Sequence, residues 1–212
     1  MKIVDLTHPM ANGMPVMAGI EPPQFRELAD VSADGYAMSQ YTFVNHTGTH
    51  VDAPAHQIAG GASLDEIPLD RLVTYAVTID LTRHQPGPVG QTDLDGQLDR
   101  VEAGDLVFFR SDNARNWGTA GYWHGWCYPD ALAARALIDR DVAGIGFDGP
   151  SADPVDTDDY ELHRIWLGAG KIIIENLASL AELPVRCRVV VAPLKVRHAN
   201  GGPARVFALV DD

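Results

Sequence analysis

Residues 45–56 read Asn-His-Thr-Gly-Thr-His-Val-Asp-Ala-Pro-Ala-His (NHTGTHVDAPAH), and this motif decides what fold and chemistry the sequence predicts. Three of the eight histidines and one aspartate fall within eleven of its positions. Thr47, Gly48 and Thr49 disfavour a helix, and Pro54 would end one. The residues just before the motif, Gln-Tyr-Thr-Phe-Val, are typical of a strand. We therefore predict an extended backbone through the motif.

An extended backbone places residues of one parity on the same face of the chain. The even-numbered residues of the motif include His46, Gly48, His50, Asp52 and His56. Gly48 has no side chain, so it leaves room for an ion between the two histidines that flank it. Imidazoles and a carboxylate suit zinc, manganese or iron, whereas calcium needs more oxygen donors. The proline before His56 redirects the chain, so we expect His56 to lie beside the ion and to move protons.

The composition indicates a folded protein that acts on a small molecule or another protein. The chain has 212 residues, of which 46% are hydrophobic and 21% charged, and its net charge is −13. An acidic surface repels nucleic acids and anionic membranes, and no apolar run reaches the roughly 18 residues of a membrane span. Cys127 and Cys187 lack metal-binding spacing and are expected to be reduced thiols. Since the N-terminus does not resemble a signal peptide, these features favour a cytoplasmic enzyme.

Apolar, β-branched runs predict more strands than helices. Strands are expected at residues 2–7, 40–46, 73–82, 105–110, 142–147, 171–175, 187–192 and 204–210. A longer helix should begin at Pro129 and Asp130, and Ser63 with Glu66 has the capping-box spacing of a one-turn helix. Thr157 is expected to cap a helix that runs to about Leu167. With no repeat or linker, residues 1–212 are predicted to form one α/β domain with a mixed β-sheet core and few helices.

The motif His-Thr-Gly-Thr-His-Val-Asp-Ala-Pro-Ala-His resembles the signature of the metal-dependent cyclase family, which includes bacterial kynurenine formamidases and isatin hydrolases. Four further segments are similar to family segments: DLTHPM (5–10), GMPV (13–16), GIGFDGPSADP (144–154) and APLKVRHANGGPARVFAL (192–209). The resemblance implies a swivelling β/β/α cyclase-like fold over residues 1–212. It also implies a homodimer or a higher homo-oligomer.

The resemblance also implies a ligand set for the metal. Family members complete the site with a histidine and a glutamate twelve positions apart, which His163 and Glu175 match. Glu175 follows three isoleucines, and a carboxylate buried there needs a positive partner. By resemblance, one or two Zn²⁺ or Mn²⁺ ions are held by His46, His50, Asp52, His163 and Glu175, and His56 is the catalytic acid/base.

The chemistry that this site implies is hydrolysis of an amide, cyclic amide or ester bond of a small molecule. A metal lowers the pKa of a bound water from near 16 to about 7, and no serine nucleophile is needed. Met17 stands where kynurenine formamidases carry an aromatic residue, so we expect it to contact the substrate and leave the substrate's identity open. The alternatives are an isatin- or lactone-type ring-opening hydrolase, a metal-dependent cyclase or dehydratase, and a non-catalytic metal-binding protein.

Overall fold

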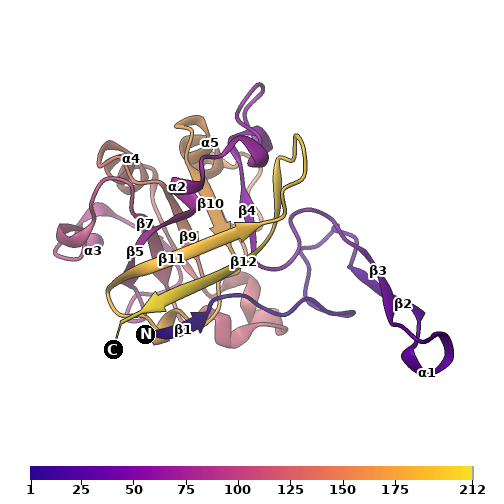
Figure 1. Cartoon of the computed structure of the whole chain (residues 1–212). Coiled ribbons are helices and arrows are strands. Elements are labelled where there is room, and N and C mark those ends of the chain that lie inside the picture. The colour runs from indigo at the N-terminus through magenta and orange to yellow at the C-terminus, as the bar shows by residue number, and fades with distance from the viewer. Residues whose placement is uncertain (212) are drawn as a thin grey trace.

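A computed structural model describes residues 1–211 as a mixed sheet flanked by a few helices (Figure 1). The strands of the main sheet are β1 (Lys2–Asp5), β4 (His50–Asp52), β5 (Val73–Asp80), β7 (Leu106–Arg110), β9 (Gly144–Phe147), β10 (Ile172–Glu175), β11 (Arg186–Pro193) and β12 (Gly201–Val210). They are ordered β1-β12-β11-β5-β7-β9-β10-β4. Since β12 also pairs with β4, the sheet closes on itself like a barrel.

Two short ribbons and several short helices complete the chain. The ribbons pair β2 (Gln24–Ala29) with β3 (Met38–Thr42) and β6 (Gly87–Val89) with β8 (Cys127–Pro129). The α-helices are α1 (Val31–Asp34), α2 (Leu69–Leu72), α3 (Gln91–Leu94), α4 (Ala131–Asp139) and α5 (Glu161–Gly168). The 3₁₀ turns are η1 (Pro54–His56), η2 (Leu64–Glu66), η3 (Leu98–Arg100), η4 (Asn113–Asn116), η5 (Ala120–His124) and η6 (Leu180–Glu182). No helix within residues 1–211 has the length and apolar character needed to cross a lipid bilayer.

The main sheet separates two apolar cores. Along β10, Ile172 and Ile174 face the core enclosed by the curved sheet, whereas Ile173 faces the core shared with α4 and α5. All three side chains are fully buried. This alternation follows from the two-residue period of a strand, and a strand that is apolar on both faces lies inside the protein. The last residue of β10, Glu175, is therefore held rigidly by the strand before it.

Most predicted elements are present, and one helix start is wrong. Seven of the eight predicted strand regions coincide with strands of the main sheet, whereas the region 40–46 overlaps β3 only at residues 40–42. Asp130 caps α4 by accepting a hydrogen bond from the backbone of Ala133, and Ser63 forms the predicted capping box of η2. However, α5 begins at Glu161, so Thr157 is not its cap. The first turn of α5 instead donates its backbone N–H groups to the Asp153 carboxylate.

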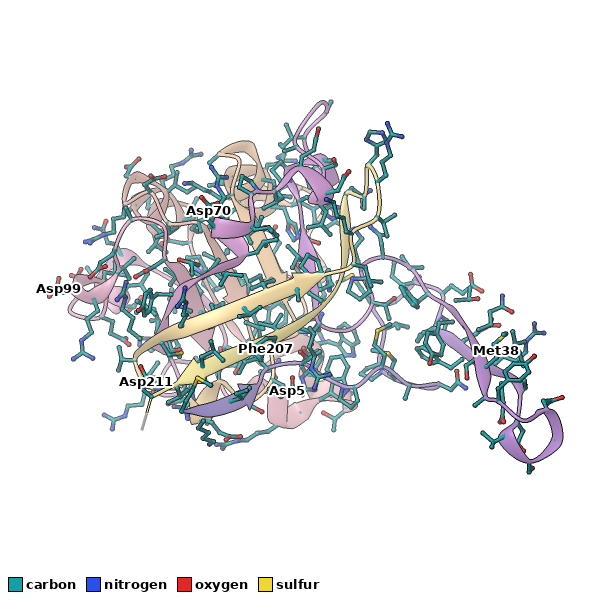
Figure 2. The ribbon with its side chains drawn as sticks, in the orientation of Figure 1. Asp5, Met38, Asp70, Asp99, Phe207 and Asp211 are labelled. Carbon is teal, nitrogen blue, oxygen red and sulfur yellow. The ribbon has the colours of Figure 1, made fainter. Side chains whose placement is uncertain are left out.

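The β2–β3 ribbon and the α1 turn that joins its strands form an arm, which we define as residues 24–42. Figure 1 shows the arm extending away from the main sheet. Met38, labelled in Figure 2, lies on it among other exposed side chains. At its base, the side chain of Asn12 bonds to both the N–H and the carbonyl of Phe25. The arm is thus anchored at one end and exposed over most of its length.

Candidate metal centre

The histidine motif is extended only in its middle, so the prediction of one continuous extended row is wrong. β4 spans His50–Asp52, between β10 on one side and β12 on the other, whereas residues 45–49 form turns. Gly48 has a φ of +66°, a conformation that favours glycine. A Cβ added there would lie 3.1 Å from the end of the Met14 side chain. Gly48 therefore turns the chain back toward the site rather than leaving a gap in a straight strand.

Four of the predicted site residues converge, although they come from three separate elements. Antiparallel pairing of β4 and β10 places His50 opposite Glu175, and α5 supplies His163. His50 Nε2 lies 3.3 Å from Glu175 Oε2 and 3.4 Å from Asp52 Oδ1. His163 Nε2 lies 3.4 Å from Glu175 Oε1 and 3.6 Å from Asp52 Oδ2. All four side chains are buried. Two ring nitrogens and two carboxylates thus face one another in a space of ionic dimensions.

The other ring nitrogens of these histidines are already engaged. His50 Nδ1 donates to the Gly48 carbonyl at 2.8 Å, and His163 Nδ1 bonds to Asp153 at 2.6 Å. A carbonyl can only accept, so a neutral His50 must carry its proton on Nδ1 and point its Nε2 lone pair at the carboxylates. Lone pairs and carboxylates repel one another at such distances unless a cation lies between them. This donor set therefore fits a metal ion, and the partner at Nδ1 is the usual way in which a protein orients a metal-binding imidazole.

The pKa values of His50 and His163 in the ion-free cluster also indicate that the two carboxylates require a positive partner. Burial disfavours the imidazolium form of His50, but Asp52 and Glu175 outweigh that effect and raise its pKa to about 10. Burial also opposes protonation of His163, yet its bonds to Asp153, Asp52 and Glu175 raise its pKa well above its usual value. Without an ion, protons on His50 and His163 would therefore balance the two carboxylates. A metal ion would displace these protons, because an imidazole must be neutral to bind a metal.

His46 and His56 form a second donor group that shares Asp52 with the first. Ligand atoms of His46, Asp52 and His56 lie within 4.8 Å of one another, as do those of His50, Asp52 and Glu175. His46 Nδ1 is 2.7 Å from Asp52 Oδ1, and the rings of His46 and His56 lie 4.1 Å apart. The structure thus brings all six predicted metal-ligand and catalytic residues to one place, with Asp52 at the junction of two donor groups.

Two supporting residues were missed by the sequence analysis. Asp153 binds His163 Nδ1 and also the first turn of α5, so it fixes both the ring and the helix that carries it. Asn176 has a positive φ of 58°, and its side chain donates to the Gly48 carbonyl and accepts from the Tyr122 hydroxyl. Asp153 stands in the segment GIGFDGPSADP (144–154), so its place in that segment was the available signal. Asn176 carries no sequence pattern of its own.

A cavity of about 370 Å³ opens onto these side chains. Its other walls include Met17, Ile20, Trp117, Trp123 and Tyr160. The Trp117 ring stacks on the buried His8 ring at 4.0 Å, which fixes its orientation. Met17, which the sequence predicted to contact the substrate, lies on the wall of this cavity. The cavity combines large apolar and aromatic surfaces with a polar end, which is the usual composition of a small-molecule site.

Comparison with known proteins finds relatives that are similar to this chain over nearly its whole length. The chain is 29% identical to a kynurenine formamidase of Salinibacter ruber (strain DSM 13855 / M31), over 97% of this chain and 96% of the relative. Its structure is similar to isatin hydrolase A from Labrenzia aggregata, with a TM-score of 0.91, 28% identity and coverage of 100% and 94%. It is also similar to a protein from Bacillus stearothermophilus described as a predicted metal-dependent hydrolase, with a TM-score of 0.80, 31% identity and coverage of 98% and 97%.

These likenesses confirm the predicted cyclase-like α/β fold with its mixed sheet and few helices. Residues 4–154 match the profile of a family described as "Putative cyclase", and this segment includes the whole histidine motif. Because the match extends over more than half of the sequence, the chain belongs to this cyclase family.

Proposed function

We propose that the chain is a metal-dependent hydrolase of the arylformamidase type, which cleaves a carbon–nitrogen bond other than a peptide bond. The single observation that carries the proposal is the convergence of His50 and His163 Nε2 with two carboxylates at the end of an aromatic cavity. The relatives, a kynurenine formamidase and an isatin hydrolase, act on aryl amides by name and support the same class of reaction.

The proposed ligands are His46, His50, Asp52, His163 and Glu175. Two donor groups that share Asp52 support a pair of ions rather than one. Imidazole-rich sites with carboxylates suit Zn²⁺ or Mn²⁺ better than calcium. When bound, the metal supplies Lewis acidity, which acidifies a water molecule and polarises a carbonyl group.

His56 is the proposed acid/base. It lies beside the ligand cluster, with its ring 4.1 Å from that of His46 and 5.8 Å from that of His163. Burial is the main reason that its pKa is lowered. A ring nitrogen of His56 would take the proton of the attacking water and return it to the departing nitrogen, so that the amine leaves neutral. Ser151 also lines the cavity, but no nucleophilic role is assigned to it.

The walls of the cavity favour an aromatic or other apolar substrate next to the scissile bond. Trp117 and Trp123 offer flat apolar faces, and Met17 offers a flexible one. An N-formyl arylamine and a cyclic aryl amide of the isatin type both present a carbonyl beside an aromatic ring. The isatin-type reaction is the second candidate, because the isatin hydrolase superposes over the whole chain.

Three wider proposals accompany this function. Residues 1–212 act as one catalytic domain, since the two apolar cores lie on opposite faces of one sheet. Cys127 and Cys187 are both free and buried, which supports a cytoplasmic enzyme. The protein works as a homodimer on a small-molecule substrate.

The decisive experiment combines elemental analysis with a substrate panel. Purified protein should hold a stoichiometric transition metal and should hydrolyse an N-formyl arylamine or isatin, and EDTA should abolish the activity. Mass spectrometry of the product would show whether water has been added. Ring closure or dehydration without water uptake would favour a cyclase or dehydratase, and tight metal binding without turnover would favour a non-catalytic protein. Activity that survives complete removal of metal would contradict the proposal.

A further inference from the structure

The Gly48 carbonyl, which orients the ring of His50, accepts two hydrogen bonds. His50 Nδ1 donates to it at 2.8 Å, and the side-chain amide of Asn176 donates to it at 2.9 Å. Gly48 has a φ of +66°, and glycine has more backbone freedom than any other residue, so the direction of its carbonyl depends on the groups that bond to it. If the carbonyl turned away, the proton of a neutral His50 would lose its acceptor at Nδ1 and could move to Nε2. A protonated Nε2 has no lone pair for a metal, so the direction of this carbonyl decides whether His50 can be a ligand.

Asn176 is held beside this carbonyl by its own backbone. It directly follows Glu175 at the end of β10, and its side chain is buried. Its φ of 58° is a left-handed conformation that asparagine tolerates better than most residues. Its N–H donates to the Gly149 carbonyl at 2.9 Å, and its carbonyl accepts from the Thr49 hydroxyl at 2.6 Å. Asn176 therefore bonds to two consecutive residues of the histidine motif, Gly48 and Thr49.

The Asn176 amide is in turn oriented by the hydroxyl of Tyr122. A carbonyl only accepts, so Asn176 Nδ2 must face Gly48, and Oδ1 then accepts from the Tyr122 hydroxyl at 2.7 Å. Burial, together with the negative charges of Asp148 and Glu175, raises the pKa of Tyr122 well above its usual value, so the hydroxyl keeps its proton and remains a donor. Tyr122 is fully buried, and a hydrogen bond away from bulk water is stronger than an exposed one.

We propose that Asn176 and Tyr122 are positioning residues for the metal ligand His50. The Tyr122 hydroxyl holds the Asn176 amide, the amide holds the Gly48 carbonyl, and the carbonyl keeps the His50 proton on Nδ1. The inference rests on the proposed function, because it takes His50 to bind a metal. It extends the site to two residues that are not ligands themselves and that act on the ligand one through the other.

Tyr122 also joins this series of hydrogen bonds to the aromatic wall of the cavity. Its ring makes edge contacts with Trp117 at 5.0 Å and with Trp123 at 5.6 Å, and both tryptophans line the cavity. Its backbone carbonyl accepts from the side chain of Asn113, whose own N–H donates to Asp148. These contacts hold the Tyr122 ring in place without its hydroxyl. The change Tyr122→Phe should therefore remove the bond to Asn176 and leave the packing of the wall unaltered.

Metal affinity, rather than activity, tests the proposal in Tyr122→Phe, in Asn176→Gly and in the two combined. Glycine suits the left-handed backbone at position 176, so the second change removes the side chain without strain. The whole chain, stripped of metal with EDTA, is titrated with Zn²⁺ or Mn²⁺ in competition with a chelator. Asn176→Gly should weaken metal binding about 10- to 100-fold, the usual effect of losing a group that supports a ligand. Tyr122→Phe should weaken it about 5-fold, the effect of one hydrogen bond. Because Tyr122 acts through Asn176, the combined variant should bind no more weakly than Asn176→Gly.

Thermal melts separate positioning from a general structural role. In a positioning role, the rise in melting temperature on adding Zn²⁺ should be smaller in Tyr122→Phe than in the wild type, because binding contributes less to stability. In a merely structural role, the metal-free and metal-loaded melting temperatures would fall by the same amount. Tyr128→Phe is the matched control, since Tyr128 is a partly buried tyrosine packed against the core shared with α4 and α5, and it should keep the wild-type affinity.

Three results would overturn the inference. One is a metal affinity in either single variant equal to that of the wild type. Another is a set of losses that add up in the combined variant, since Tyr122 would then not act through Asn176. The third is an equal loss in Tyr128→Phe. A wild-type chain that binds neither Zn²⁺ nor Mn²⁺ would instead refute the metal centre itself, so a failure of the proposed function is distinguishable from a failure of this inference.

Discussion

Two buried acids in this protein, Asp52 and Asp148, have opposite surroundings. Asp52 is 1% exposed and faces His46, His50 and His163, which lower its pKa well below the usual value against the effect of burial. Asp148 is also 1% exposed but is bonded to the backbone N–H groups of Ser111 and Asn113. Burial raises its pKa to about 7, because these amides compensate only in part. Burial alone therefore does not make a metal ligand; the facing imidazoles do.

Replacing each acid by its amide removes the charge with little change of shape. Asp52→Asn should reduce both metal content and hydrolysis to background, because it removes the ligand shared by the two donor groups. Asp148→Asn should retain the metal, since no imidazole faces that residue at hydrogen-bonding distance among the contacts of residues 1–211. Elemental analysis of the two variants, with thermal melts to verify folding, makes the measurement. Equal metal loss in both would refute the distinction.

A variant of His56 tests whether this residue acts in catalysis or in metal binding. His56→Ala should lower kcat by about 10²–10⁴-fold, the usual contribution of a general acid/base, while the metal remains bound. The loss should appear in kcat rather than in KM, which steady-state kinetics with a metal assay would show. Because His56 also lies within reach of His46 and Asp52, loss of one metal equivalent would instead identify it as a ligand.

A variant of Asp153 tests whether its hydrogen bond to His163 Nδ1 strengthens metal binding. Asp153→Asn keeps an acceptor for His163 Nδ1 but removes the negative charge, so metal affinity should fall about 10- to 100-fold. Competition with a chelator measures this change. Ser63→Ala, which removes side-chain bonds to Asp65 and Glu66 in the η2 turn rather than to a proposed ligand, is a suitable control and should leave metal affinity unaltered. An affinity in Asp153→Asn equal to that of the wild type would show that the carboxylate serves only the helix.

The last prediction concerns the pH dependence of the stability contributed by Asp148. Its folded-state pKa of about 7 lies above the usual value of 3.8, so the folded protein holds this proton more tightly than the unfolded chain does. The wild type should therefore lose stability relative to Asp148→Asn as pH rises from about 4 to 7, and the difference should then level off. Urea unfolding of both proteins across this range measures the change. A difference that stays constant or grows in favour of the wild type would indicate that the backbone amides hold the carboxylate ionised.

The sequence predicted the parts of the fold that depend on local pattern. The buried isoleucines before Glu175 and the capped start of α4 at Asp130 follow from period and capping alone. The turn at Gly48 was not predicted, because a β-branched motif is compatible with a strand until tertiary contacts act on it. Likewise Asp153, rather than Thr157, starts α5 through a contact across a loop. The convergence of the site residues was expected by family resemblance, whereas the network around Asn176 arises only from the folded arrangement.

The position of β4 has a consequence for how the protein is made. The histidine motif leaves the ribosome early, but β4 is held between β10 and β12, and Gly201 of β12 lies against the His46 ring so closely that a Cβ there would be 2.6 Å from the ring. A nascent chain that has not yet reached β12 lacks one of the two strands that flank β4, and such long-range pairing forms late. A translation product that ends before β12 would therefore carry all the donors but lack the strand that backs the His46 ring, and we expect its metal centre to be incomplete.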